Sequence, residues 1–149
     1  MRHGSRAVAA LIAAPVLLAA TPPAAAGGNV SMEVTGLRNA KGQVLACLTA
    51  HPKAFPDCSK DPAARTAVVP ASASVRIDFG HVPAGRYAIS LIHDENGNRK
   101  MDMAIMMPKE GYGFSRNAPV SFGPPKFAKA AFDVTGGDVV QQAKMRYLL

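Results

Sequence analysis

A short polar stretch in the second half of the chain places oxygen-bearing side chains at regular intervals. The stretch runs from Asp94 to Asp102 and contains these four residues: Asp94, Asn96, Asn98 and Asp102. They stand at positions 1, 3, 5 and 9 of a calcium-binding loop, with the Lys100 carbonyl at position 7 and Glu110 as a later carboxylate that folds back. The spacing predicts a weak calcium site. A hydrogen-bonded turn without an ion stays open as the alternative, because Asn, Asp and Gly are common turn residues.

Soft metal ligands overlap the same region. His93 precedes the loop, and the Met101–Met107 segment holds these methionines: Met101, Met103, Met106 and Met107. Imidazole and thioether groups suit copper(I), so a small periplasmic copper handler is one alternative. The other alternative is that these methionines only fill space in the packing beneath this segment.

A hydrolase would need a nucleophile beside a base. His93 and Asp94 are neighbours on an expected strand, so their side chains point to opposite faces. Ser115 lies in no nucleophile-elbow motif. We therefore predict no catalytic residues and no enzyme activity, and keep a hydrolase that uses His93 as an alternative.

The first 26 residues read as a secretory signal peptide. Arg2 and Arg6 form a basic start, an apolar run follows from 7 to 20, and alanines at 24–26 provide a cleavage site before Gly27. The remaining residues 27–149 are expected to form one domain without a transmembrane segment. The predicted location is periplasmic or secreted.

Charge excludes some partners. Removing residues 1–26 takes away two arginines and no acid, which leaves 15 basic and 10 acidic residues and a net charge of +5. The basic residues are scattered and are not interleaved with aromatic residues, so nucleic acid is not an expected partner. An envelope protein or a glycan of unknown identity is the partner we expect.

The two cysteines predict one disulfide. Cys47 and Cys58 form an even pair in a chain expected to be exported, where thiols oxidise. Their spacing lacks the C-x-x-C pattern of redox-active thiols. The bond would tie down a proline-rich loop.

Alternating apolar and polar residues recur along the chain. Period-two patterns span these ranges: 30–35, 43–49, 74–79, 87–92, 130–134 and 139–148. The segments are short, separated by turn residues, and not linked by crossover helices. The pattern predicts an all-β fold: an antiparallel two-sheet sandwich, transthyretin-like or Ig-like, of about seven strands.

A long irregular segment, about residues 94–128, interrupts this pattern. It carries Tyr112, Phe114, Phe122 and Phe127, which either anchor the segment on the sandwich or form an exposed binding face. We call residues 103–128 the flap. His93, Glu110 and Tyr112 are expected to join the flap to the sandwich.

Three motifs together resemble a known family. They are VPAGRY (82–87) leading into SLIHDEN (90–96), PKEGYGFS (108–115), and FGPPKF (122–127). The chain resembles the bacterial exported family DUF2141 over essentially all of residues 27–149. The resemblance implies a transthyretin-like or Ig-like sandwich of the cell envelope with no established activity.

The chain departs from the family pattern at two places. Members typically have glycine where Arg99 stands, and they favour a polar residue and a glycine within the stretch occupied here by residues 103–107. Both departures weaken the calcium interpretation, since position 6 of such a loop requires a sharp turn. The sequence predicts an exported, non-catalytic accessory or binding module of the bacterial envelope. It requires no cofactor, and calcium is the candidate ion.

Overall fold

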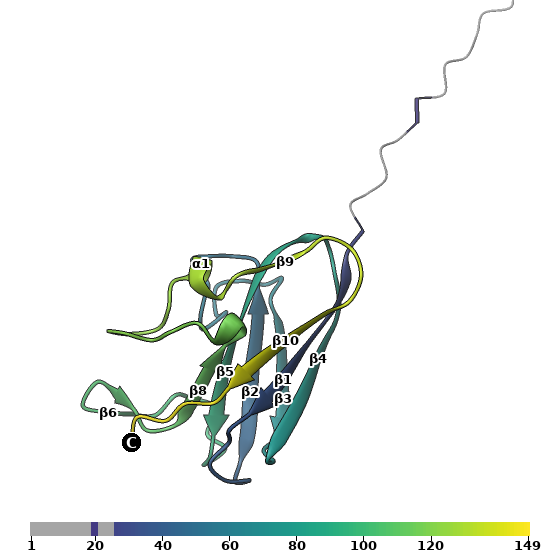
Figure 1. Cartoon of the computed structure of the whole chain (residues 1–149). Helices are drawn as coiled ribbons and strands as arrows, with labels where there is room; N and C mark the ends of the chain where they lie inside the picture. The colour runs from purple at the N-terminus through teal and green to yellow at the C-terminus, as the bar shows by residue number, and fades with distance from the viewer. Residues whose placement is uncertain (1–18, 21–25) are drawn as a thin grey trace, which may run out of the picture.

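Two sheets built from the alternating segments face each other (Figure 1). The computed structural model describes residues 19–20 and 26–149. The first sheet has the order β10 (Val139–Lys144), β1 (Gly28–Thr35), β4 (Ser74–Val82). The second has the order β3 (Arg65–Pro70), β2 (Gln43–Thr49), β5 (Gly85–Asp94), β8 (Gly111–Phe114), and β9 (Phe132–Val134) pairs with the start of β5.

Period-two burial produces the core between these sheets. In β4 the odd-numbered residues from 75 to 79 are buried while their neighbours are exposed, as expected of a strand with one solvated face. The largest fully buried side chains come from both layers: Val30, Met32, Val34, Val44, Leu48, Ile77, Ile89 and Leu91. The predicted all-β sandwich is therefore confirmed.

One strand pairing differs from the expected antiparallel arrangement. β1 and β10 are parallel, with Val30 opposite Val139 and Thr35 opposite Lys144. A parallel pair needs a long crossover connection. Here the rest of the sandwich supplies that connection, so no crossover helix is required.

The segment 94–128 is more ordered than the sequence suggested. It contains β8, which pairs with residues 90–93 of β5, and a separate hairpin of β6 (Met103–Ala104) and β7 (Met107–Pro108). A 3-10 turn (η1, Ser115–Asn117) and one helical turn (α1, Phe127–Ala130) follow. The expectation of one long irregular loop was wrong for β8, because its GYGF sequence has glycine at alternate positions and shows no apolar alternation.

The C-terminal segment closes the sandwich along β8. Tyr112 and Arg146 exchange two backbone hydrogen bonds of 3.0 and 2.9 Å. Gly111 is required at this crossing, because a Cβ atom there would lie 2.4 Å from a ring carbon of Tyr147. β8 thus links the five-stranded sheet to the chain that leaves β10.

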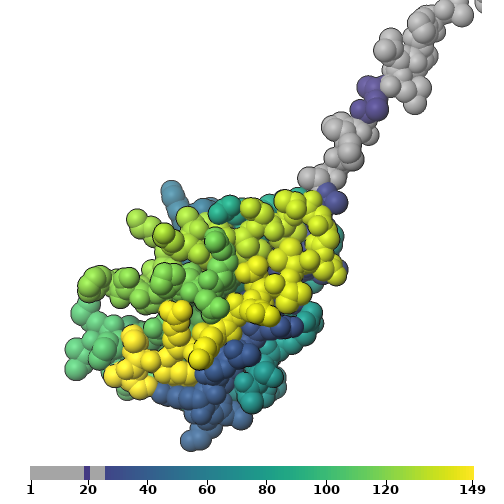
Figure 2. Space-filling model, viewed as in Figure 1, coloured from purple at the N-terminus to yellow at the C-terminus, as the bar shows by residue number. Residues whose placement is uncertain are grey.

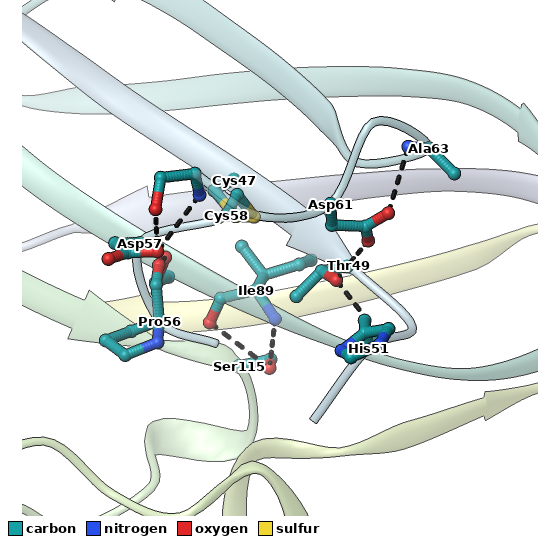
Figure 3. Close-up of a disulfide and its surroundings, with 12 residues drawn as sticks. Cys47, Thr49, His51, Pro56, Asp57, Cys58, Asp61, Ala63, Ile89 and Ser115 are labelled. Carbon is teal, nitrogen blue, oxygen red and sulfur yellow. Dashed lines mark hydrogen bonds between the residues drawn. A yellow bond between two sulfur atoms is a disulfide. The ribbon is translucent and has the colours of Figure 1, made fainter. Parts of the chain in front are cut away.

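The predicted disulfide is present and joins β2 to the loop that follows it (Figure 3). Cys47 lies on β2 and Cys58 in the following loop, with their Cα atoms 6.2 Å apart. The hydroxyl of Ser90 donates to the Pro56 carbonyl in the same loop. The loop between β2 and β3 is therefore fastened to the sheet covalently and by hydrogen bonding. The predicted signal peptide falls almost entirely outside the described residues.

Candidate functional site

The polar loop begins where β5 ends, and Asp94 organises it. Asp94 is buried, and its carboxylate accepts hydrogen bonds from the backbone amides of Asn98 (3.1 Å) and Arg99 (2.8 Å) and from the side-chain amide of Gln43 (2.8 Å). Burial works to raise the pKa of Asp94, but these bonds together outweigh it and lower the pKa. A carboxylate has about four acceptor positions. Asp94 therefore uses most of its capacity to hold the turn.

The other loop oxygens are joined to one another. The side-chain amides of Asn96 and Asn98 both donate to Asp102, at 2.6 and 2.9 Å. Their own carbonyl oxygens accept the backbone amides of Asn98 (3.0 Å) and Lys100 (2.9 Å). Among residues 19–20 and 26–149, no three His, Cys, Asp or Glu side chains are grouped to hold a metal ion. A cation would have to displace the two amide groups from Asp102.

Loop position 6 has the backbone conformation that a calcium loop needs. Arg99 has a φ of +61°, in the left-handed region that favours glycine. For a residue with a Cβ atom this conformation costs about 1 kcal/mol or more. The turn is therefore imposed by the hydrogen bonds to Asp94, against the preference of the arginine.

Glu110 is the acid that folds back onto the loop. It is 3% exposed, and one carboxylate oxygen accepts the backbone amide of Asp102 at 3.2 Å. The other oxygen, Oε1, is buried without a hydrogen-bond partner. Burial, with the charges of Asp94 and Asp102, raises the pKa of Glu110. A cation or a proton at Oε1 would relieve this arrangement.

His93 is buried within a hydrogen-bond network unlike the one expected. Its Nε2 lies 2.8 Å from the Lys41 carbonyl oxygen and so carries the proton, while Nδ1 lies 2.7 Å from the Tyr147 hydroxyl. Both ring nitrogens are thus engaged. Glu110 accepts the Asp102 amide and is not bonded to the His93 imidazole, and neither partner of His93 is a methionine sulfur. A copper ion bound to His93 would have to displace one of these two partners.

Sequence reasoning missed the ion pair next to this network. Arg38 donates to both carboxylate oxygens of Glu95 and lies with its guanidinium 4.6 Å from the Tyr147 ring centre. It also donates to the carbonyl of Lys109, at 3.2 Å. The hydrogen bond from Arg38 lowers the pKa of Glu95 to about 2. Arg38 and Glu95 lie 57 positions apart in sequence, and no local pattern connects them.

Two of the flap aromatics, Tyr112 and Phe114, face inward. Tyr112 is 6% exposed and Phe114 7%, and they form a second small core with Ala88 and Ala130. Phe127 is half-buried against this cluster, and Phe55 of the disulfide loop packs 5.8 Å from Phe114 between ring centres. Of the two alternatives left open by the sequence, the structure shows Tyr112 and Phe114 as anchors, so neither offers an exposed binding face.

The exposed apolar groups lie elsewhere on the flap. Ile105 is 95% exposed and Met106 90%, at the tip of the β6–β7 hairpin, and Phe122 is fully exposed in the next loop. Figure 1 shows both loops extending from the same side of the sandwich. We call Ile105, Met106 and Phe122 the apolar rim. The signal was present in the sequence, since Met103–Met107 is an uninterrupted apolar run within an otherwise polar segment.

The backbone at the hairpin tip is strained. Ile105 and Met106 are the two central residues of the turn, with φ values of +46° and +70°. Turns of this kind favour Asn-Gly, and a β-branched residue at positive φ is a genuine outlier. Each such backbone conformation costs about 1–3 kcal/mol.

Comparison with known proteins agrees with the motifs described above. The model of a family of uncharacterized proteins conserved in bacteria, DUF2141, matches residues 32–142. The chain belongs to DUF2141. No curated protein and no solved structure matches it. The DUF2141 match begins within β1 and ends within β10, so the polar loop, the hairpin and β8 lie inside the matched region.

A bacterial family and a disulfide are compatible with a location outside the cytoplasm. In the described part of the chain, we find no helix of the length and apolar character that crossing a membrane demands.

Proposed function

We propose that this DUF2141 protein is an exported, non-catalytic binding module of the bacterial cell envelope, in the periplasm or secreted. The observation that supports this is the apolar rim. Ile105 and Met106 occupy a turn that would be less strained with Asn-Gly, and both side chains are almost wholly in water. Exposed apolar groups of this kind mark interaction sites. The sandwich presents the rim, while Tyr112 and Phe114 hold the flap in place.

Photo-crosslinking in the protein's own cells tests this proposal. A photoreactive phenylalanine analogue at Met106 is expected to give an adduct, visible in the intact mass of the purified protein. Val68 provides the matched control, because it is an exposed apolar residue on the edge strand β3, outside the flap. Equal adducts from both positions, or none from Met106, would contradict a binding role for the rim.

A second candidate function is weak calcium binding at the polar loop, in addition to the rim. The unpaired Oε1 of Glu110 supports it, together with the left-handed backbone at Arg99. The proposed calcium ligands are Asp102, Glu110 and the Lys100 carbonyl. Asn96 and Asn98 would join them after turning their side-chain oxygens toward the ion. Asp94 supports the turn. Binding stabilises the folded protein by about 1.4 kcal/mol when free calcium is tenfold above the dissociation constant.

Calcium titration of the melting temperature separates this site from a simple turn. The wild-type melting temperature is expected to rise with calcium, and Glu110→Gln should abolish the rise. Glu33→Gln is the control. Glu33 and its partner Arg76 both lie on the three-stranded sheet, while the polar loop follows a strand of the other sheet, and the Glu33 side chain is exposed. A melting temperature that does not respond to millimolar calcium would leave the loop as a turn only.

A further inference from the structure

The chemistry around the apolar rim identifies its partner more closely. This inference rests on the proposed binding role of the rim and names the class of partner. Charge is the second observation. Between Met103 and Phe132 the chain carries four basic residues, Lys109, Arg116, Lys126 and Lys129, and all four are exposed. The same span holds one acid, Glu110, which is buried.

Two more basic residues lie just before the hairpin. Arg99 and Lys100 are exposed in the polar loop and stand four and three positions before Met103, the first residue of β6. Lys109 follows β7 directly. The strained tip is therefore an apolar point with three basic residues, Arg99, Lys100 and Lys109, and one partly buried acid, Asp102, near its base in sequence.

We infer that the flap attaches the protein to an anionic phospholipid surface, with Ile105 and Met106 entering the acyl region and the basic residues contacting the headgroups. The hairpin presents the tip on two residue pairs, Met103 with Pro108 and Ala104 with Met107, and leaves the Ile105 and Met106 side chains in water. Apolar side chains with basic neighbours bind anionic membranes by burial of apolar area and by charge attraction acting together. Phe122, in the other loop on this side of the molecule, adds an aromatic ring at the interface. Figure 2 shows this side in profile, with the two loops projecting at the left.

The turn residues provide a variant that removes the tip without weakening the fold. Ile105→Asn combined with Met106→Gly installs the residues that a two-residue turn with positive φ prefers. The hairpin should then be at least as stable as in the wild type. The melting temperature of the variant protein should therefore not fall below that of the wild type. Loss of binding in this variant cannot be attributed to unfolding.

The test is sedimentation of the purified protein with vesicles of phosphatidylglycerol and phosphatidylcholine, compared with vesicles of phosphatidylcholine alone. The wild type is expected to bind the anionic vesicles at about 0.01 M salt and to be released at about 1 M salt, where the screening length falls from about 30 to about 3 Å. The Ile105→Asn/Met106→Gly variant should bind at least tenfold more weakly. Lys109→Gln should weaken binding about fivefold.

Val68→Thr is the control for general apolar exposure and should bind as the wild type does. All forms share the same N-terminal residues, so any contribution of that segment cancels between them. Equal binding by the wild type and the tip variant would overturn the inference, as would binding that ignores lipid charge and salt. Self-association through the rim without vesicle binding, seen by analytical ultracentrifugation, would also overturn it.

The two proposals fail separately. A protein or glycan adduct from Met106 without vesicle binding would keep the binding module and reject the lipid surface. No adduct from Met106 in the cell would reject the binding module itself.

Discussion

The sandwich and the flap are stabilised in different ways. In the sandwich, strands with alternating apolar residues bury one face of each sheet, and many side chains contribute to the stability of this core. In the flap, a small cluster around Tyr112 and Phe114, the buried hydroxyl of Ser115 and a few loop hydrogen bonds hold about 26 residues in place. A region held by a few anchors leaves its other positions free to carry exposed or strained residues. That is where Ile105, Met106 and Phe122 lie.

The largest expected effect comes from removing the flap's main anchor. Tyr112→Ala should lower the free energy of unfolding by about 3 kcal/mol or more, as large core truncations do. Hydrogen exchange should show residues 103–128 losing protection before β1, β2 and β4 do. Phe122→Ala is the control and should change stability by less than about 0.5 kcal/mol, because its ring is exposed. Unchanged protection of the flap in Tyr112→Ala would mean that the cluster does not anchor it.

The disulfide tests the sandwich side of the comparison. Replacing both Cys47 and Cys58 with serine should cost about 2–3 kcal/mol, since the bond closes a short loop. Protection should fall first in residues 50–64, and then in the flap, because Phe55 of that loop packs against Phe114. Denaturant unfolding and hydrogen exchange measure both effects. Two alkylatable thiols in the non-reduced wild-type protein would contradict the bond.

The Arg38–Glu95 pair lies where the sandwich meets the flap. It should make the free energy of unfolding depend on pH in the acid range. The pKa of Glu95 is about 2 in the folded protein and about 4.5 when unfolded. A lowered carboxyl pKa stabilises the fold above the unfolded value, and this stabilisation is lost as the pH falls from about 4.5 to about 2. Allowing for solvent screening, we expect about 1 kcal/mol.

Glu95→Gln should remove this part of the pH dependence, measured by urea unfolding at several pH values. Glu33→Gln serves as the control, because the Glu33–Arg76 pair is more exposed on the other sheet. Identical pH profiles for the wild type and Glu95→Gln would show that the pair does not contribute.

The smallest expected effect concerns the polar loop. Arg99→Gly should raise stability by about 0.5 kcal/mol, because the gain from relieving a left-handed arginine exceeds the added entropy of glycine in the unfolded chain. Lys100→Gly should lower stability instead, since Lys100 is not among the residues with positive φ. Thermal melting compares the two. A loss of stability in both variants would show that the Arg99 conformation carries little strain.

The sandwich could be predicted from sequence because its signals are local. Strands such as β4 alternate between buried and exposed residues from 74 to 80, and a chain with two cysteines leaves one pairing. The parallel contact of β1 with β10 was not predictable, because nothing within either strand records which way its neighbour runs. β8 was missed because two of its four residues are glycines that make room for Leu91, Met145 and Tyr147.

The polar loop was located from its residue types, but its chemistry depends on contacts with distant residues. Gln43 completes the bonds to Asp94, and Lys41 and Tyr147 occupy both nitrogens of His93. These partners come from β2, its preceding turn and the C-terminal segment, 51 to 54 positions away. The predicted ligand set 94–102 with Glu110 therefore stays a prediction, and the calcium titration tests it.

The pairing of β1 with β10 also bears on how the protein is made. A ribosome or a translocation channel releases the chain from its first residue onward, so β1 emerges more than 100 residues before its parallel neighbour. Contacts this distant in sequence slow folding. The three-stranded sheet cannot be completed until residue 144 is free, nor the closure along β8 until residue 146. The nascent protein therefore keeps an unpaired edge on β1 until synthesis is almost finished, so this sheet is completed only after nearly the whole chain has been released.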